Sequence, residues 1–128
     1  MVVINDRWLF DKVTDELVDI SGDFVLSLKP LQSRILEIFT HSPFVVISRK
    51  SLLSSGWLAH GFIVCNNSLN QVVYGLRTTM SALPERVPTI KTVPRIGYCF
   101  AADVRLANNR ERHARANKRT YPDTAAMP

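Results

Sequence analysis

One amphipathic stretch, residues 67–83 (NSLNQVVYGLRTTMSAL), constrains the fold of this chain more than any other. The opposite faces of a helix over this stretch differ sharply. One face carries amides, hydroxyls, a phenol and one guanidinium but no carboxylate, and these groups suit base edges and phosphates. A plain surface helix that lacks acids is the alternative. The other face is apolar at the helical spacing: Leu69, Val72, Val73, Leu76, Met80 and Leu83.

A chain of 128 residues is long enough for one domain with a hydrophobic core. Its 46% apolar content is typical of a globular protein. The apolar runs are far shorter than the ~20 residues of a membrane span, and the first residues, MVVINDRW, lack the pattern of a signal peptide. Cys65 and Cys99 have no metal-ligand spacing, so two free thiols in an intracellular protein are expected, with a disulfide as the alternative.

The net charge of +5 is distributed unevenly along the chain. Residues 1–28 carry two basic and six acidic side chains, residues 29–106 carry nine and three, and residues 107–128 carry five and two. This polarity predicts that the N-terminal part turns away from a polyanion that the rest of the chain faces. The polyanion is a nucleic acid or, alternatively, an anionic membrane surface.

The residues before the amphipathic stretch predict a small sheet followed by a helix. Residues 8–28 contain three short β-prone runs separated by turn signals, which predicts an antiparallel meander. A first helix is expected to be capped by Ser27, to have Pro30 in its first turn and to end near His41. Its expected apolar stripe consists of Leu31, Ile35, Ile38 and Phe39.

A second helix lies between this segment and the amphipathic stretch. The apolar residues 44–47 are expected to form a buried, extended run. Ser48 is a good N-cap for a short helix over residues 49–56. Asn66 or Asn67 then caps the amphipathic helix. The side chains of the short helix expected to point inward are Leu52, Leu53 and Trp57.

A β-hairpin and a tail complete the chain. Residues 90–93 and 98–101 are β-prone and flank the turn-forming sequence Pro94-Arg95-Ile96-Gly97. After about residue 106 large apolar side chains almost disappear, so residues 107–128 are expected to form a flexible basic tail. The expected fold class is therefore α+β: a winged helix-turn-helix with an N-terminal antiparallel β-meander, three helices and a C-terminal hairpin wing, in one domain over residues 1–106.

Five motifs, in this order and spacing, resemble the winged helix-turn-helix DNA-binding domain of the OmpR/PhoB type. They are Trp8–Asp11 (WLFD), Leu26–Pro30 (LSLKP), Val46–Arg49 (VISR) with Leu52, Leu53 and Trp57, Asn67–Leu69 with Val73, Leu76 and Arg77, and Ile90–Tyr98 (IKTVPRIGY). The resemblance covers roughly residues 4–104. The Pro94-Arg95 form of the hairpin is similar to the ToxR/CadC branch, in which this domain is the N-terminal, cytoplasmic part of a bacterial membrane-anchored regulator.

The resemblance implies a sequence-specific DNA-binding transcriptional regulator, more often an activator than a repressor. The helix over residues 67–83 would enter the major groove of double-stranded DNA, and the hairpin over residues 90–101 would touch the adjacent minor groove or its phosphates. Family members commonly bind direct repeats as head-to-tail dimers, and the apolar connection 58–66 corresponds to a region that contacts RNA polymerase in some of them. The basic tail would be a juxtamembrane linker, with a membrane tether after residue 128.

Twelve residues are candidates for contacts with DNA. Arg77, as a phosphate contact, and Arg95, at the hairpin tip, are the strongest; a surface salt bridge or a solvated side chain is the alternative. Amides can pair bidentately with adenine, so Asn70, Gln71 and Tyr74 are candidates for reading base edges, with a solvated face as the alternative. The other candidates lie at helix N-termini, on the amphipathic helix or on the hairpin: Asn67, Ser68, Thr78, Lys91, Thr92, Arg49 and Lys50.

The amphipathic helix is expected to bind phosphates only weakly. Tyr74, Gly75, Thr78 and Thr79 stand where many family members carry arginine or lysine. The hairpin, the start of the second helix, a dimer partner or a tether must therefore supply much of the affinity. Gly75 costs ~1 kcal/mol relative to alanine inside a helix, and either close approach to DNA or simple tolerance would explain it.

Enzymatic chemistry, a metal and a cofactor are not expected. His41, His60 and His113 are scattered and have no nucleophile partner, and the sequence contains no glycine-rich phosphate loop. The acidic side chains near the N-terminus have no coordination-loop spacing and are expected to form a solvated face. Trp8 and Tyr98 are expected to lie in the core. The main competing hypothesis is a protein-interaction module with a winged-helix fold and little affinity for DNA.

Overall fold

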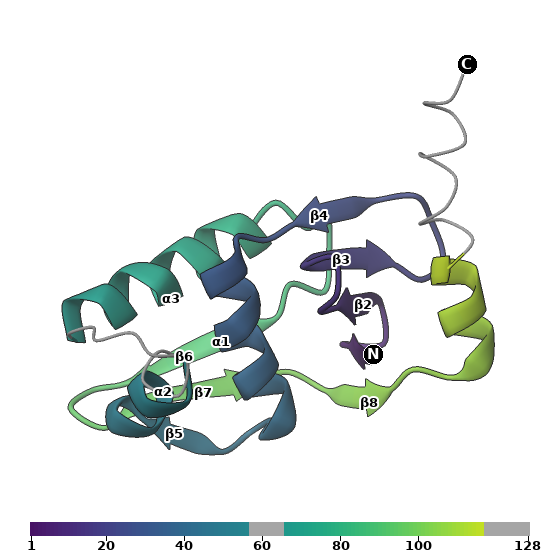
Figure 1. The fold of residues 1–128 in the computed structure, drawn as a ribbon. Coiled ribbons are helices and arrows are strands. Elements are labelled where there is room, and N and C mark those ends of the chain that lie inside the picture. Colours follow the sequence, from purple (N-terminus) through teal and green to yellow (C-terminus); the bar gives the residue numbers. More distant parts are fainter. Residues whose placement is uncertain (57–65, 117–128) are drawn as a thin grey trace.

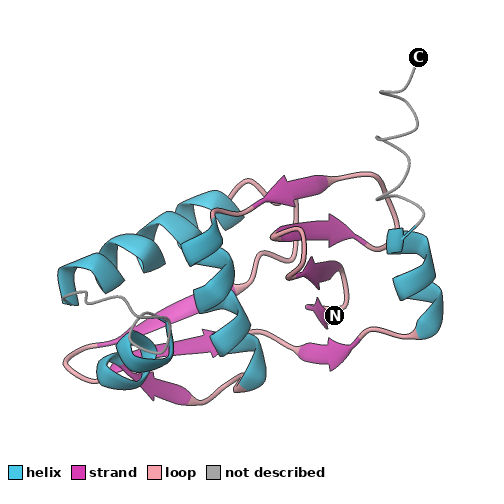
Figure 2. Cartoon of the chain, viewed as in Figure 1, coloured by secondary structure: helices cyan, strands magenta, loops and turns pink. Residues whose placement is uncertain are grey.

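The computed structural model describes residues 1–56 and 66–116, which form two antiparallel sheets and several helices (Figure 1, Figure 2). The strands are β1 (Val2–Ile4), β2 (Trp8–Asp11), β3 (Glu16–Asp19), β4 (Val25–Ser27), β5 (Val46–Ser48), β6 (Thr89–Val93), β7 (Gly97–Ala101) and β8 (Val104–Leu106). The helices are α1 (Pro30–His41), α2 (Arg49–Gly56) and α3 (Asn66–Met80), and residues 109–116 are also helical. The strand orders are β4-β3-β2-β1-β8 and β5-β7-β6.

The predicted α+β architecture is confirmed. The meander β2-β3-β4 is antiparallel, with Trp8 opposite Asp19 and Leu17 opposite Leu26. The hairpin β6-β7 forms the predicted wing, and β5 pairs along its other side. Strands β1 and β8 were not predicted, because each has only three residues and pairs with a partner that is distant in sequence: Val3 lies opposite Arg105.

The main core lies between the helices and the two sheets. The predicted apolar face of α3 is confirmed, since Leu69, Val73, Leu76 and Met80 are fully buried. Trp8 and Tyr98 are also buried, as predicted. Because α3 is held by this whole stripe, its opposite face is fixed in direction and exposed to solvent.

The N-cap of α1 lies two residues later in the sequence than the expected cap, Ser27. Ser27 is still in β4, opposite Glu16, and the helix is preceded instead by Lys29, whose N–H donates to Gln32 Oε1 at 3.1 Å. Pro30 occupies the first turn as predicted. The buried face of α1 differs from the prediction in two residues. Leu31, which was predicted to be part of it, is exposed, and Leu36, which was not, is fully buried.

The prediction that residues 44–47 form a buried run is wrong. Phe44, Val45 and Val46 are 61%, 54% and 45% exposed, and only Ile47 packs against the core. The physical reason is the position of β5, which is the edge strand of its sheet and pairs only with β7. One face of such a strand contacts the core, whereas the outer edge and the preceding turn remain in solvent.

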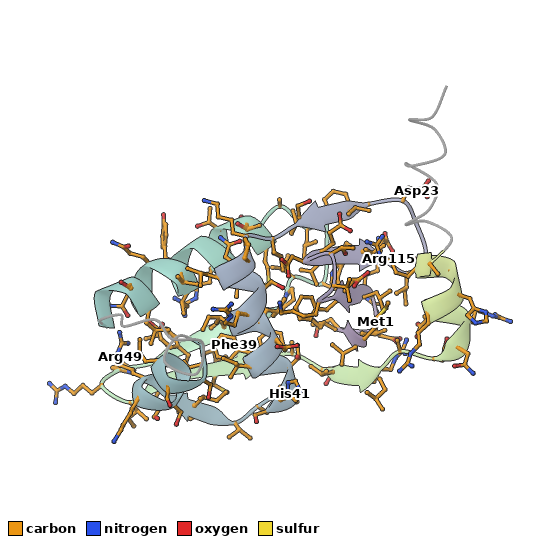
Figure 3. The ribbon with its side chains drawn as sticks, viewed as in Figure 1. Met1, Asp23, Phe39, His41, Arg49 and Arg115 are labelled. Carbon is orange, nitrogen blue, oxygen red and sulfur yellow. The ribbon has the colours of Figure 1, made fainter. Side chains whose placement is uncertain are left out.

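The prediction of a flexible tail from residue 107 is wrong for residues 107–116. Residues 109–116 form a helix, and its cap is reciprocal: Asn108 N–H donates to Glu111 Oε1 at 3.0 Å, and Glu111 N–H donates to Asn108 Oδ1 at 2.8 Å. Arg115 is 5% exposed, and its Nε donates to Asp11 Oδ2 at 2.9 Å. Glu16 is a second carboxylate partner of Arg115. This helix packs on the N-terminal sheet (Figure 3).

The helix 109–116 explains why the sheet is buried on both faces. Strand side chains alternate between faces, and the face of the sheet that points away from the main core carries Val3, Leu9 and Val18. These side chains form a second small core together with Ala107. Without the C-terminal residues this apolar face would be exposed to solvent.

The acidic N-terminal residues do not form the solvated face that was predicted. Besides Asp11 and Glu16, Asp19 accepts two hydrogen bonds from Arg7, both at 3.0 Å. Burial raises the pKa of the Asp19 carboxyl, but the hydrogen bonds from Arg7 and Ser21 outweigh burial and lower that pKa overall. Much of the negative charge of the N-terminal sheet is therefore neutralised inside the domain.

Candidate nucleic-acid interface

The exposed face of α3 is the predicted base-reading surface, and the structure exposes most of it. Asn70, Gln71, Tyr74 and Thr78 are exposed, with 71% of Tyr74 accessible to solvent. Ser68, in the first turn, is half-buried. The side chain of Asn67 and the connection 57–65, which contains Trp57, lie outside the described residues.

The start of α2 lies against the first half of α3 (Figure 3). Ser48 caps α2 as predicted, because its Oγ accepts a hydrogen bond from the Ser51 N–H at 3.1 Å. The next residue, Arg49, donates a hydrogen bond to the Asn70 side-chain oxygen. Lys50 follows on the exposed surface. Arg49 of α2 therefore borders the amide-rich part of α3, and Lys50 is exposed next to it in the sequence.

A buried tyrosine joins these side chains to the wing. The hydroxyl of Tyr98, in β7, donates to Asn70 Oδ1 at 2.7 Å and accepts from Arg49 Nη1 at 3.4 Å. Two guanidinium carbons, of Arg49 and Arg77, lie 5.5 and 5.6 Å from the centre of its ring. Tyr98 was predicted only as a core residue, and its role in orienting polar side chains has no signal in the sequence.

Arg77 is half-buried between α3 and the wing. Its Nε and Nη2 donate to the carbonyl of Ile90 at 3.0 and 2.6 Å, and Nη2 also donates to Thr92 Oγ1 at 2.7 Å. The predicted alternative, a salt bridge to Glu85 or Glu37, is not the observed arrangement. Arg77 joins the recognition helix to the hairpin, and its contact with phosphate stays a prediction.

The wing places further basic side chains beside α3. Lys91 and Thr92 are exposed on β6, and Arg95 is exposed at the tip. The turn is closed by the Ile96 N–H, which donates to the Val93 carbonyl at 3.0 Å, and Arg95 has a φ of 68° at its third position. Glycine or asparagine is usual at such a left-handed position, so an arginine here is conformationally unfavourable.

Two glycines permit close packing around the interface. A Cβ at Gly97 would overlap the carbonyl oxygen of Ile47, so the contact between β5 and β7 requires glycine. A Cβ at Gly75 would lie 3.0 Å from Gln32 Nε2. Gly75 therefore lies beside the Gln32 side chain of α1, and the two explanations, close approach to DNA or simple tolerance, stay predictions.

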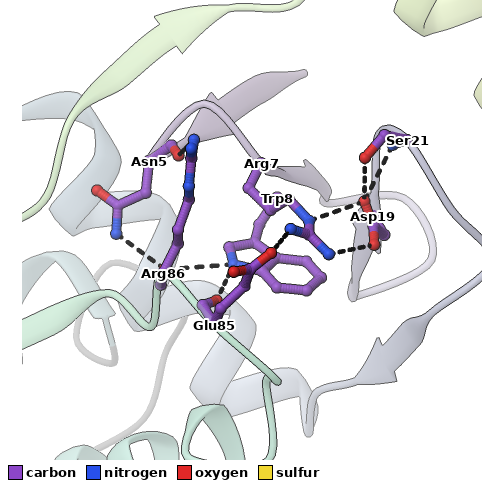
Figure 4. Close-up of polar contacts among 7 residues, drawn as sticks. All are labelled: Asn5, Arg7, Trp8, Asp19, Ser21, Glu85 and Arg86. Atoms are coloured by element: carbon purple, nitrogen blue, oxygen red, sulfur yellow. Dashed lines mark hydrogen bonds and ion pairs between the residues drawn. The ribbon is translucent and has the colours of Figure 1, made fainter.

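The loop after α3 is fastened to the N-terminal sheet (Figure 4). Trp8 Nε1 donates to the carbonyl of Glu85 at 3.1 Å, and Asn5 Nδ2 donates to the carbonyl of Arg86 at 3.0 Å. Arg7 contacts the Glu85 carboxylate as well as Asp19. These contacts fix the C-terminal end of α3, while α2 and β7 contact its N-terminal half.

The described residues contain no group of three or more histidine, cysteine or acidic side chains that could hold a metal ion. Cys99 is a free, half-buried thiol, and Cys65 lies outside the described residues. Within residues 1–56 and 66–116 no helix is long and apolar enough to cross a bilayer. The chemistry that the surface around α3 offers is hydrogen bonding and positive charge.

A family model described as "Transcriptional regulatory protein, C terminal" matches residues 23–100. The "Cholera toxin transcriptional activator" of Vibrio cholerae serotype O1 is 31% identical over 103 residues, which are 80% of this chain and 35% of the relative. The "Cholera toxin homolog transcriptional activator" of Vibrio parahaemolyticus serotype O3:K6 is 33% identical over 97 residues, or 75% of this chain and 33% of the relative. The chain spans about a third of the length of these curated relatives.

Solved structures with the same fold include the DNA-binding domain of Escherichia coli CadC, with a TM-score of 0.71 and 25% identity over 83% of this chain and 95% of that one. The C-terminal domain of the nisin resistance regulator NsrR has a TM-score of 0.62 and 27% identity, covering 74% and 92%. The Klebsiella pneumoniae RstA DNA-binding domain, solved in complex with the RstA box, has a TM-score of 0.61 at 20% identity, covering 78% and 96%, which is a likeness of fold alone.

Proposed function

This chain belongs to the family described as "Transcriptional regulatory protein, C terminal", and we propose on this basis that residues 1–106 bind double-stranded DNA in a sequence-specific manner. Family membership and the relatives confirm the resemblance to the OmpR/PhoB type and to its ToxR/CadC-like branch. Regulators of this class are generally not enzymes. In the proposed complex α3 enters the major groove, and the wing lies on the adjacent minor groove or its phosphates.

One observation supports this proposal: the exposed face of α3 has no acidic side chain, and basic side chains lie on two sides of it. Asn70, Gln71 and Tyr74 offer hydrogen-bonding groups to base edges, and the helix is narrow enough for the major groove. Lys50 next to Arg49 on one side, and Lys91 with Arg95 on the other, are placed to contact phosphates. Phosphate contacts fix the register, whereas base contacts give the sequence preference.

A titration of labelled duplex DNA across salt concentrations tests this proposal. With roughly four to seven phosphate contacts, the logarithm of the binding constant should fall with the logarithm of salt concentration at a slope of about −4 to −6. Fluorescence anisotropy with randomised duplexes measures the slope, and selected duplexes measure the preference. No binding to any duplex at about 50 mM salt, where non-specific affinity is strong, would exclude DNA as the ligand.

The second candidate function, a protein-interaction module, is favoured by one observation. Phe44, Val45 and Val46 expose apolar surface at the edge strand β5, and such surface is typical of contact sites. In that case the domain would bind a protein through this edge and would show no salt-dependent affinity for DNA. The two functions are compatible if DNA binding is observed as well.

The finer parts of the function are proposals that extend from the relatives. The two Vibrio relatives are named as transcriptional activators, so we place this chain among activators. Residues 58–66, largely outside the described part, would contact RNA polymerase, and two copies would bind direct repeats head to tail. The domain would work in the bacterial cytoplasm, with a membrane tether after residue 128 in the protein to which it belongs.

A further inference from the structure

The side-chain amide of Asn70 is held in a single orientation, and from this geometry we propose that Asn70 acts as a hydrogen-bond donor only when α3 reads DNA. Asn70 would then prefer bases with an acceptor edge and would discriminate against cytosine. This inference rests on the DNA-binding function proposed above and assigns one residue a defined part in its specificity.

Chemistry fixes which end of the amide faces inward. Asn70 Oδ1 accepts a hydrogen bond from the Tyr98 hydroxyl at 2.7 Å and another from Arg49 Nη2. An arginine side chain has only donors, so an inverted amide would point its own N–H groups at another donor. The Tyr98 hydroxyl accepts from Arg49 Nη1 at 3.4 Å, so its single proton is directed to Asn70.

The two partners of Asn70 are themselves held in place. Tyr98 is 4% exposed and lies in the central strand of its sheet. Arg49 follows the capped start of α2, and its guanidinium carbon lies 5.5 Å from the Tyr98 ring centre. The orientation of Asn70 is therefore set before DNA binds, which reduces the entropic cost of using it in the complex.

The consequence concerns the free end of the amide. Asn70 is exposed, and none of its hydrogen bonds to described residues involves Nδ2. In the major groove this N–H₂ group can donate to O6 or N7 of guanine, to O4 of thymine or to N7 of adenine, whereas cytosine presents its own donor, N4. A bidentate pair with adenine also requires an accepting oxygen, and both acceptor positions of Asn70 Oδ1 are occupied.

The neighbouring residue provides an internal contrast. Gln71 is exposed, and its side chain makes no hydrogen bond with a described residue, so its amide can turn and offer both a donor and an acceptor. Gln71 is thus suited to the bidentate adenine pair that was expected of both residues. The two adjacent amides should specify different bases at different positions of the site.

Selection from a randomised duplex library, followed by sequencing, tests this assignment and does not require the target site to be identified beforehand. We expect one position at which the wild-type protein prefers guanine or thymine to cytosine by about fivefold or more, the low end for a base contact. Asn70→Ala should level the preference at that position only. Asn70→Asp keeps an oxygen towards Arg49 and Tyr98 but replaces the outward donor by an acceptor, so the preference should change to cytosine or adenine, which present the N4 and N6 donors.

The outcomes separate this inference from the proposed function. Enriched motifs that are the same in wild type, Asn70→Ala and Asn70→Asp would overturn the role of Asn70 and leave DNA binding intact. A wild-type preference for adenine over both guanine and thymine that Asn70→Ala removes would indicate the bidentate pair and show that the amide turns after all. Gln71→Ala should alter a different position, and failure to enrich any motif with any variant would refute the proposed function itself. Because Asn70 is exposed, the alanine variant is expected to fold.

Discussion

At the scale of single residues, Arg77 determines how the wing is placed relative to α3. Its three hydrogen bonds, to the carbonyl of Ile90 and to Thr92, come from one guanidinium group. A lysine could not reproduce this geometry, because its ammonium group is a single point of donation. Loss of Arg77 would thus act on binding through the position of β6, in addition to any charge it contributes to phosphate binding.

We predict that Arg77→Ala lowers the free energy of unfolding by ~1–3 kcal/mol, because charged hydrogen bonds to a backbone carbonyl are lost. DNA binding should weaken on all sequences, since the wing would no longer be held. Chemical denaturation and anisotropy titrations measure the two effects. Unchanged stability with a salt slope reduced by about 0.9 would instead identify Arg77 as a direct phosphate contact and contradict the positioning role.

The matched comparison is Arg95→Gly at the tip of the wing. Arg95 has a φ of 68°, where glycine has no steric penalty, so this change should leave stability equal or higher. DNA affinity should nevertheless fall, with the salt slope reduced by about 0.9, because one phosphate contact is lost. Equal affinity of Arg95→Gly and wild type at all salt concentrations would remove Arg95 from the interface.

The two interface glycines should respond differently to alanine. Gly97→Ala forces a methyl group into the carbonyl of Ile47, and we expect a loss of ~1–3 kcal/mol or more in unfolding free energy because backbone must move. At Gly75 the gain in helix propensity, ~1 kcal/mol, opposes a contact with the far end of the Gln32 side chain, so the net change should be small. Thermal denaturation of both variants measures this difference, and an equal loss at both sites would contradict it.

At the scale of elements, the sequence predicted those features that depend on neighbouring residues alone. The helical stripe of α3 and the Ser48 cap of α2 were recognisable because spacing and capping are short-range properties. The exposure of Phe44–Val46 depends on which strand ends up at a sheet edge, which the apolar run itself does not encode. Candidate base-reading residues were found by composition, but the Tyr98 network that orients Asn70 requires three distant segments to meet.

The sequence contains a capping signal for the helix 109–116, but the lack of large apolar residues led to the prediction of a flexible tail. Asn108 and Glu111 have the spacing of a capping box, and the structure forms both of its hydrogen bonds. The segment lacks large apolar residues because it is held by ion pairs rather than by a hydrophobic stripe. Arg115 and its carboxylate partners lie about a hundred residues apart in the chain, so no local pattern could predict that pairing.

We predict that Arg115→Met destabilises the domain by ~3–5 kcal/mol, the usual cost of removing one partner from a buried ion pair. Asp11 is fully buried and would lose the guanidinium group with which it pairs. Urea denaturation measures the loss, and hydrogen exchange should show residues 109–116 opening first. Arg112→Ala, an exposed site on the same helix, should change stability by no more than ~0.5 kcal/mol. Similar values for the two variants would mean that the helix is not held by Arg115.

The same helix should weaken in acid. Two hydrogen bonds from Arg105, at 2.9 and 2.8 Å, lower the pKa of Glu111 from its usual 4.5 to about 2. Because the pKa is lower in the folded state, the stabilisation is complete above pH 4.5 and is lost as the pH falls towards 2. The difference in unfolding free energy between wild type and Glu111→Gln should therefore be constant near neutral pH and vanish near pH 2. A difference independent of pH would refute the role of this ion pair.

At the scale of the whole molecule, the uneven charge of the sequence becomes a polarity in space. The acidic N-terminal sheet lies at one end, and Arg49 with the wing tip lies at the other (Figure 1, Figure 3). The helix 109–116 joins the acidic end, where Arg115 and Arg105 pair with its carboxylates. Arg49 and the wing residues Lys91 and Arg95, in contrast, lie near α3 at the other end. Residues 107–116 thus lie at the end of the molecule opposite the wing tip, and which charged surface faces a polyanion stays a prediction.

This polarity leads to a prediction about tethering. The helix 109–116 lies at the end of the molecule opposite the wing tip, so attachment at residue 116 should leave the proposed DNA-binding surface open (Figure 1). The test uses Ala116→Cys and Lys91→Cys, each biotinylated, in a background with Cys65 and Cys99 replaced by alanine. Both variants are first shown to bind DNA in solution and are then immobilised on streptavidin.

The protein held through position 116 should bind DNA with an affinity close to its value in solution, because neither α3 nor the wing is near the surface. The protein held through position 91 should lose most of its binding, because β6 would face the support. Equal loss in both arrangements would mean that DNA also requires the acidic end or the C-terminal helix. Retained binding through position 91 would place the wing outside the interface, and the major-groove helix alone would then have to account for the affinity.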